Sequence, residues 1–308
     1  MKHSRAVTLT KCQDGHSLNF HAMASPCEVI IQSTDPQLAI KLGNIIASEV
    51  WRIEDKYSRY DQNSICSVIN NSAGQTVNID EETYLLLNFA EQCYQLSDGL
   101  FDITSGILRK VWRFDGSDKL PTSTQVAKYL SYVGWRKVKF DQQQITLADG
   151  MEIDFGGIGK EYAVDRAIIL AKQLTNLPIL INLGGDLAVT RARLNNAPWQ
   201  VAIEHPDIDS TKSNIDNNSS TADMIISLTS GALATSGDAR RYLLNKGKRY
   251  GHVLNAKTGW PIENAPRSIT VVAPACIQAG ILATMALLQG DNAEQFLSEQ
   301  EIKFWSRR

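Results

Sequence analysis

Apolar and polar residues follow two different periods along the chain. Over 36–53, apolar residues recur at steps of three and four, which predicts an amphipathic helix. A second helix is predicted over 80–96, where an aspartate N-cap is followed by two glutamates, and a third over 160–174. Two short apolar runs, 28–33 and 178–183, predict strands, and the second ends at two glycines as a buried strand does at a tight turn.

Two segments in the middle of the chain, 137–154 and 199–229, have patterns that predict β-hairpins. Residues 137–154 predict short strands around a glutamine-rich turn, the last of them near 151–154. Strand-like segments at 199–204 and 224–229 flank a polar stretch, 207–222, that is rich in Asp, Ser, Asn and Thr. This stretch is expected to be a long polar loop between the two strands.

The alternation of helices and strands predicts the fold class. The most apolar stretch, 268–290, is interrupted by Pro274 and Gln278, so it predicts a buried strand and a buried helix and no membrane span. Helices and strands interleave without a composition break, which indicates a mixed α/β (α+β) fold with intertwined subdomains. We expect a single domain over 21–308, preceded by an N-terminal extension over 1–20.

The cysteines and the N-terminal residues indicate a compartment. The five cysteines are widely spaced and include no CxxC pair, so neither a disulfide framework nor a zinc site is predicted. Residues 1–20 are polar and lack the apolar core of a signal peptide, and no lipobox-like run precedes Cys12. The cytoplasm is therefore the expected location, with the periplasm as the alternative if a leader has been lost.

Composition and charge narrow the class of partner. Of the 308 residues, 43% are hydrophobic and 21% charged, with a formal net charge of -2, which is typical of a globular protein. Binding to a nucleic-acid backbone requires a basic field, so no nucleic-acid partner is expected. A small anionic ligand remains possible, because a helix N-terminus and a few local charges can hold one.

The most informative motif runs from Asp154 to Asp165, with the sequence DFGGIGKEYAVD. A strand, a glycine turn and a helix N-terminus in succession form an anion-binding arrangement, and Lys160 could neutralise a phosphate. The spacing matches neither the Walker A motif nor GxGxxG. A phosphate or nucleotide site and a turn needed only for packing therefore both remain open.

Three other segments carry polar groups in suggestive positions. Asp102 could bind the polar edge of a heterocycle with Phe101 packed beneath it, although capping of the next helix is the more usual role of such an aspartate. His252 is the best general-base candidate, because only histidine has an unperturbed pKa near neutrality. Thr284 lies on an apolar helix, where a hydroxyl bonded to its own helix backbone is the stronger explanation.

Taken in order, these segments resemble the ApbE family, the FAD:protein FMN transferases, from about residue 20 to the C-terminus. The resemblance implies an ApbE-like (T-fold-like) architecture. The matching segments are AMASPCE (22–28), SRYD (58–61), DGLFD (98–102), residues 154–165, NLGGD (182–186), TSGD (235–238) and residues 252–259.

The resemblance also implies roles for individual residues. His252 falls at the position of the proposed catalytic base, which would take the proton from the acceptor hydroxyl as that oxygen attacks the FMN phosphorus and AMP leaves. The positions that match the family's FAD-binding residues are Met23, Tyr60, Leu100, Phe101, Asp102, Asp154, Lys160 and Leu254.

The implied Mg²⁺ site is where the chain departs from the family. The resemblance assigns the metal to the Gly157 carbonyl and to a helix motif that here contains Thr284, but Gly280 replaces the family's aspartate and Ala283 offers no second carboxylate. Because Mg²⁺ prefers anionic oxygen ligands, its binding should be weakened unless another carboxylate, such as Asp238, takes part. An aspartate introduced at 280 should then tighten it.

Three functions follow from the resemblance. The first is an active transferase that moves FMN from FAD to a Thr or Ser hydroxyl of a partner flavoprotein. The second is a catalytically weak FAD-binding protein, and the third is an FAD pyrophosphatase that yields FMN and AMP with water as the acceptor. Covalent flavin on an acceptor protein separates the first from the third.

Overall fold

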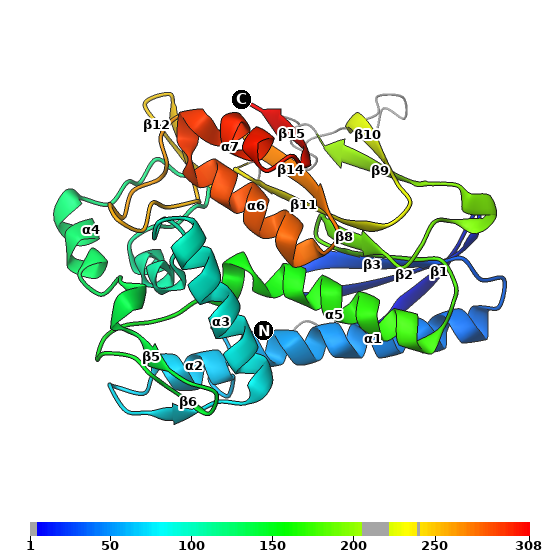
Figure 1. The fold of residues 1–308 in the computed structure, drawn as a ribbon, viewed down its shortest axis with the longest axis horizontal. Coiled ribbons are helices and arrows are strands. Elements are labelled where there is room, and N and C mark those ends of the chain that lie inside the picture. The colour runs from blue at the N-terminus through cyan, green and yellow to red at the C-terminus, as the bar shows by residue number, and fades with distance from the viewer. Residues whose placement is uncertain (1–4, 205–221, 239–240) are drawn as a thin grey trace.

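The computed structural model describes residues 5–204, 222–238 and 241–308. The predicted polar loop over 207–222 lies outside the described residues, apart from Ala222 at the start of a strand. The described chain combines one large antiparallel sheet with helices and three small sheets (Figure 1). The prediction of a mixed α/β fold is therefore confirmed.

The large sheet has eight strands in the order β1-β2-β3-β7-β8-β11-β14-β15, and every neighbouring pair is antiparallel. Its strands are β1 (Thr8–Cys12), β2 (Gly15–Ala22), β3 (Ser25–Ile31), β7 (Ile179–Leu183), β8 (Asp186–Val189), β11 (Gly231–Gly237), β14 (Ser268–Ala273) and β15 (Lys303–Arg307). Segments from both ends and the middle of the chain thus share one sheet.

Residues 8–20, within the N-terminal extension predicted over 1–20, contribute to this sheet. They provide β1 and most of β2, and β2 pairs with β3 from His16 to Ala22. Leu18 and Phe20 are buried and alternate with exposed Asn19, as the two-residue period of a strand requires. The segment lacks the continuous apolar character of the central strands because β1 lies at the sheet edge.

Helices cover one face of the sheet and a hairpin covers the other. Helices α1 (Pro36–Tyr57), α5 (Gly159–Leu174) and α6 (Cys276–Leu288) lie side by side across the first face (Figure 1). On the opposite face, the hairpin of β9 (Trp199–Glu204) and β10 (Ala222–Leu228) packs on strand residues such as Leu187 and Leu233. Burial on both faces explains why β7 and β8 have no exposed residue.

The remaining elements lie outside the large sheet and the helices and hairpin that cover it. The helices are α2 (Ile65–Asn70), α3 (Glu81–Leu96), α4 (Ser123–Leu130) and α7 (Ala293–Glu299), and the short 3-10 helices are η1 (Ile103–Lys110), η2 (Trp135–Lys137), η3 (Phe155–Gly157), η4 (Leu194–Asn196) and η5 (Gly290–Asn292). The small strands are β4 (Val77–Asn78), β5 (Lys139–Phe140), β6 (Gln144–Thr146), β12 (Tyr242–Asn245) and β13 (Lys248–Gly251).

Two of the predicted helices, α1 and α3, begin at an aspartate whose side chain caps them. The Asp35 carboxylate accepts the N–H groups of Gln37 and Leu38 at the start of α1, and Asp80 caps α3 as predicted. The strand expected near 151–154 does not form. Its backbone is satisfied by other partners instead, because the Ile153 N–H is donated to the Asn70 side chain.

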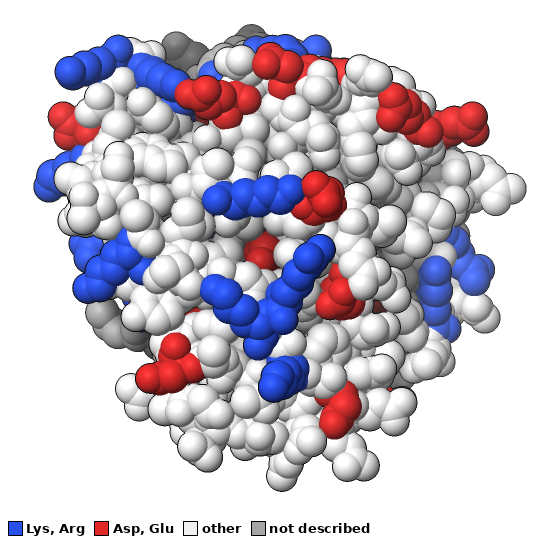
Figure 2. All heavy atoms as spheres, turned by 60° about the vertical axis from the view of Figure 1, so that its left-hand side comes forward, with Lys and Arg blue, Asp and Glu red and all other residues white. Residues whose placement is uncertain are grey.

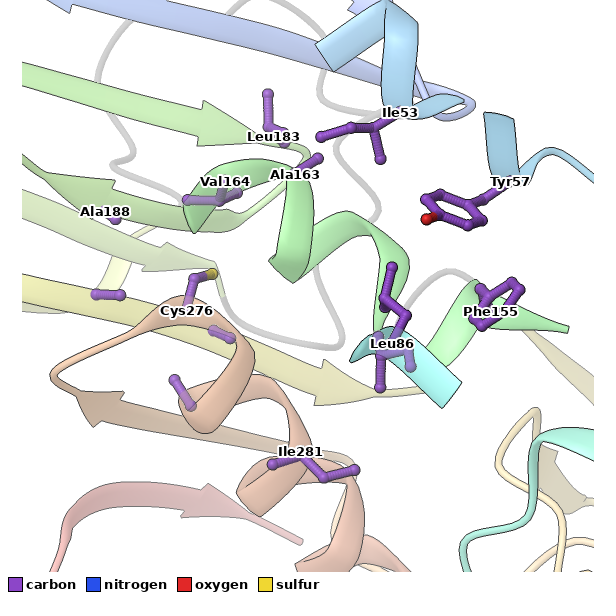
Figure 3. Close-up of a cluster of buried hydrophobic side chains, with 14 of the residues drawn as sticks. Ile53, Tyr57, Leu86, Phe155, Ala163, Val164, Leu183, Ala188, Cys276 and Ile281 are labelled. Carbon is purple, nitrogen blue, oxygen red and sulfur yellow. The ribbon is translucent and has the colours of Figure 1, made fainter. Parts of the chain in front are cut away.

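The main core lies between the sheet and its three helices. Figure 3 shows Ala163 and Val164 of α5 beside Leu183 and Ala188 of the sheet, with Cys276 at the start of α6. The small side chains on α5 let this helix approach the strands closely. Among the described residues, no helix is both long and apolar enough to cross a membrane.

Candidate active site

The glycine turn, residues 154–159, leads directly into the N-terminus of α5. Asp154 begins η3, where its Oδ1 accepts the Gly156 N–H at 2.9 Å. Helix α5 then starts at Gly159 with no side-chain cap, so its first N–H groups are not bonded by a capping side chain. A helix N-terminus in this state attracts anions, as the sequence predicted for this segment.

The segment 98–102 packs against the glycine turn. The Phe101 ring lies 3.2 Å from the position that a Cβ atom on Gly157 would take, so the absence of a side chain there permits the contact. Asp102 is buried, and its carboxylate accepts the N–H groups of Thr104 and Trp135. Burial raises the pKa of Asp102. The geometry is that of the capping role considered for Asp102.

Arg59 and Tyr60 border the same turn from the end of α1. The Arg59 guanidinium forms an ion pair with the Asp154 carboxylate and also donates to the Tyr60 hydroxyl at 2.8 Å. Tyr60 is 80% exposed, so its ring is available to a ligand. Sequence reasoning selected Tyr60 and Asp154 but not the arginine that joins them.

A group of three charges lies at the start of α5. The Lys160 ammonium contacts the Asp186 carboxylate of β8 at 2.7 Å. Burial lowers the pKa of Lys160, but the charges of Asp186 and Glu161 outweigh this effect and leave the pKa above its usual value. Burial, together with the nearby charge of Asp186, raises the pKa of Glu161 to about 8. Two carboxylates thus share one ammonium group.

Helix α6 brings the predicted metal residues beside this group. Gly280 faces Glu161, since a Cβ atom there would lie 2.6 Å from the Glu161 Cγ. Thr284 follows one turn later on the same side of α6, and its hydroxyl contacts the Ser236 hydroxyl of β11 at 3.3 Å. Among the described residues, no three His, Cys, Asp or Glu side chains form a metal-binding group.

His252 lies in the same charged region. Its ring packs edge-on against Phe114, and its buried Nδ1 has no hydrogen-bond partner. Burial, followed by the positive charge of Arg241, lowers the pKa of His252 to about 4, and Lys160 contributes in the same direction. The ring is therefore neutral at physiological pH, well outside the near-neutral range expected of an unperturbed histidine.

The remaining predicted cofactor-binding residues, Met23, Leu100 and Leu254, lie on three different segments outside the glycine turn. Met23 has a φ of 51° in the turn that also contains Ser25, and Ser25 packs against Gly184, close to Lys160. Leu100 is half-buried beside Phe101, whereas Leu254 packs on a separate cluster around Trp112.

Asp238, considered as a replacement metal ligand, already has partners. Its two carboxylate oxygens lie 2.9 Å from the Arg249 guanidinium and 2.7 Å from that of Arg267. Two guanidinium groups leave this carboxylate little affinity for a cation, which disfavours the sequence-based suggestion.

Sequence reasoning missed Arg59, Glu161 and Asp186 as members of the site. All three stand inside or next to motifs that had been recognised, but their partners lie far away along the chain. Figure 2 shows the corresponding end of the molecule, with Lys and Arg side chains beside Asp and Glu and an acidic group recessed near the centre. Both signs of charge therefore occur on this face of the molecule.

Comparisons with known proteins agree on one family. The model of the ApbE family matches residues 23–305. The FAD:protein FMN transferase of Haemophilus influenzae is 27% identical over 258 residues, which cover 81% of this chain and 70% of that protein. The enzyme of the same name from Vibrio cholerae is 26% identical and covers 80% of this chain and 73% of its own length.

Solved structures support the same architecture. The ApbE protein of Thermotoga maritima matches with a TM-score of 0.82 and 28% identity, over 94% of this chain and 93% of that one. The apo form of the flavinyl transferase ApbE from Pseudomonas stutzeri gives a TM-score of 0.80 at 23% identity, over 97% and 91% of the two chains, and supports the fold alone. The predicted ApbE-like architecture is thus confirmed.

Proposed function

Because this chain belongs to the ApbE family, we propose that it is an enzyme that transfers FMN from FAD to a Thr or Ser hydroxyl of a partner flavoprotein and releases AMP. The observation that carries the proposal is the match to relatives named FAD:protein FMN transferase over about four fifths of the chain. The glycine turn, Lys160 and His252 supply the chemistry that such a transfer requires.

The FAD pyrophosphate binds at the N-terminus of α5. The free N–H groups of the helix and the Lys160 ammonium both favour a polyanion there. The exposed Tyr60 offers an aromatic surface to the flavin, buried Phe101 supports the glycine turn from beneath, and Arg59 forms an ion pair with Asp154. Met23, Leu100 and Leu254 complete the proposed lining of the cofactor site.

His252 acts as the general base of the transfer. Its neutral ring can accept the hydroxyl proton at Nδ1, the ring nitrogen that has no partner. The hydroxyl oxygen forms its bond to the FMN phosphorus while the bond from that phosphorus to the bridging oxygen breaks. AMP carries away the negative charge, and the positive charge of Lys160 opposes its build-up.

The residues present also fit a divalent cation. Asp186 is paired with Lys160, whereas a buried oxygen of Glu161 has no partner among the described residues. The Thr284 hydroxyl and the Gly157 carbonyl supply the hard oxygen atoms that Mg²⁺ prefers. When bound, the metal would neutralise part of the pyrophosphate charge.

The test combines an acceptor peptide with FAD and Mg²⁺. Mass spectrometry should show a peptide that has gained FMN, with AMP released. His252→Ala should reduce transfer by at least about 100-fold while FAD affinity changes little, and His21→Ala, a substitution of an exposed histidine on β2, should leave both unchanged.

Two other outcomes would contradict the proposal. FMN and AMP without labelled peptide would indicate the pyrophosphatase. FAD that binds but stays intact with both peptide and native acceptor would indicate the catalytically weak FAD-binding protein.

A further inference from the structure

One carboxylate oxygen near Gly280 remains without a partner. Glu161 stands in the first turn of α5, and its Oε2 is excluded from solvent and accepts no hydrogen bond. Leaving a buried carboxylate oxygen unsatisfied costs free energy, and buried charges in proteins are normally paired or coordinate a metal. Such an atom beside a phosphate-binding turn requires an explanation.

Among the described residues, no cation forms an ion pair with Glu161, although the charge of Lys160 acts on it. Lys160, the nearest cation on the same helix, is already paired with Asp186. The second Asp186 oxygen accepts the Thr235 N–H at 3.2 Å, so both oxygens of Asp186 are used. Asp186 is thus fully occupied by Lys160 and Thr235, and it is Glu161 that lacks a partner.

The position of Glu161 coincides with the gap left on α6. A Cβ atom on Gly280 would lie 2.6 Å from the Glu161 Cγ and 2.7 Å from its Oε1. The glutamate therefore fills the space into which a side chain at 280 would project. Its carboxylate lies over the turn of α6 that precedes Thr284.

We propose that Glu161 is the anionic ligand of the divalent cation in this protein, so that α5 supplies from across the helix pair the carboxylate that α6 lacks at Gly280. The inference rests on the proposed function for the presence of Mg²⁺. Thr284 and the Gly157 carbonyl are the neutral donors of the same site. The chain thus keeps a carboxylate ligand although position 280 is glycine.

This arrangement reverses the expected effect of an aspartate at 280. The sequence alone suggested that Gly280→Asp would tighten Mg²⁺ binding. In the structure the new side chain would collide with Glu161, at distances that real Cβ atoms do not show. Gly280→Asp should therefore weaken binding by itself and restore it only when Glu161 is also shortened.

The test measures metal binding independently of catalysis. Mg²⁺ is titrated into the intact protein by calorimetry, with and without FAD, and Mn²⁺ is followed by electron paramagnetic resonance. Glu161→Gln keeps the shape of the side chain and removes the charge, so the affinity for both ions should fall at least about tenfold. Glu161→Ala alone should also lower the affinity, and the double variant Glu161→Ala/Gly280→Asp should recover most of that loss in metal affinity.

A matched control separates ligation from general electrostatics. Glu152→Gln removes a carboxylate that pairs with Arg109 and Lys110, and it should leave metal affinity unchanged. Equal affinities of the wild type and Glu161→Gln would overturn the inference, and so would equal losses in the Glu161 and Glu152 variants. Folding is checked by circular dichroism for each variant.

The result is also distinguishable from a failure of the proposed function. A wild type that binds Mg²⁺ through Glu161 but transfers no FMN would contradict the transferase alone. A wild type that transfers FMN while Glu161→Gln retains full Mg²⁺ affinity would contradict the role of Glu161 alone.

Discussion

Asp165 holds the two helices of the site together, and its removal should be costly. Helix α6 begins without a capping side chain of its own, and the Asp165 carboxylate of α5 accepts the N–H groups of Cys276 at 2.7 Å and Ile277 at 2.9 Å. One carboxylate thus serves as a cap from a neighbouring helix. Burial raises the pKa of Asp165, so part of this stabilisation is offset by desolvation.

The size of the effect can be estimated from these two bonds. A hydrogen bond to a charged group contributes roughly 1.5–3 kcal/mol, and about half of the total should remain after the cost of burying the carboxylate is subtracted. Asp165→Ala should therefore lower the free energy of unfolding by about 2 kcal/mol. At roughly 2 °C per kcal/mol for a chain of this size, the melting temperature should fall by about 4 °C.

Asp35 provides a matched control for the assay. It makes the same pair of bonds, to the N–H groups of Gln37 and Leu38, but at an exposed helix start, where the loss of a cap costs about 1 kcal/mol. Urea denaturation and calorimetry of Asp165→Ala and Asp35→Ala give the comparison. Equal losses in the two variants would refute the reasoning that Asp165 bridges the helices through a buried cap.

Two further predictions concern the pH dependence of stability and the packing of the glycine turn. Since His252 has a pKa of about 4 when folded and about 6.5 when unfolded, the unfolded state binds the proton first, and the free energy of unfolding should fall by about 2 kcal/mol between pH 7 and 5. His252→Gln should lack this part of the slope in urea titrations, and an unchanged slope would contradict the assignment. Gly106→Ala should cost about 1–3 kcal/mol and weaken FAD binding, because the new Cβ would lie 2.3 Å from the Asp154 Cβ. Gly159→Ala, whose Cβ would lie 3.7 Å from its nearest neighbour, should be tolerated in thermal denaturation, and equal losses would show that packing against Asp154 is not the cause.

Local patterns predicted much of the secondary structure because their causes are local. The α1 and α3 helices carry their own aspartate caps, and the apolar run of β7 is buried on both faces of the sheet. The strands β1 and β2 were missed because polar residues interrupt their apolar pattern: β1 lies at the sheet edge with exposed polar residues, and His16 and Ser17 of β2 are polar although they are buried. A pattern rule based on continuous apolar runs cannot detect such strands.

The site was less predictable because its contacts are long-range. His252, Lys160 and Asp154 stood out by residue type and motif, whereas the pairing of Arg59 with Asp154 joins positions 95 residues apart. Burial changed the chemistry of His252, and only the packed structure reveals its lowered pKa. The neighbour of Gly280 likewise depends on how α5 and α6 pack, which no local pattern contains.

The contact between Glu161 and Gly280 also limits how this site can have evolved. A carboxylate introduced at 280 while Glu161 is present meets a collision, and loss of Glu161 first leaves neither helix with a carboxylate at that point. Each single step is thus unfavourable, and the two positions should change together. Relatives are therefore expected to have either a glutamate at position 161 with a small residue at 280, or a small residue at 161 with a carboxylate at 280. A sequence with acidic residues at both positions should show a compensating change nearby.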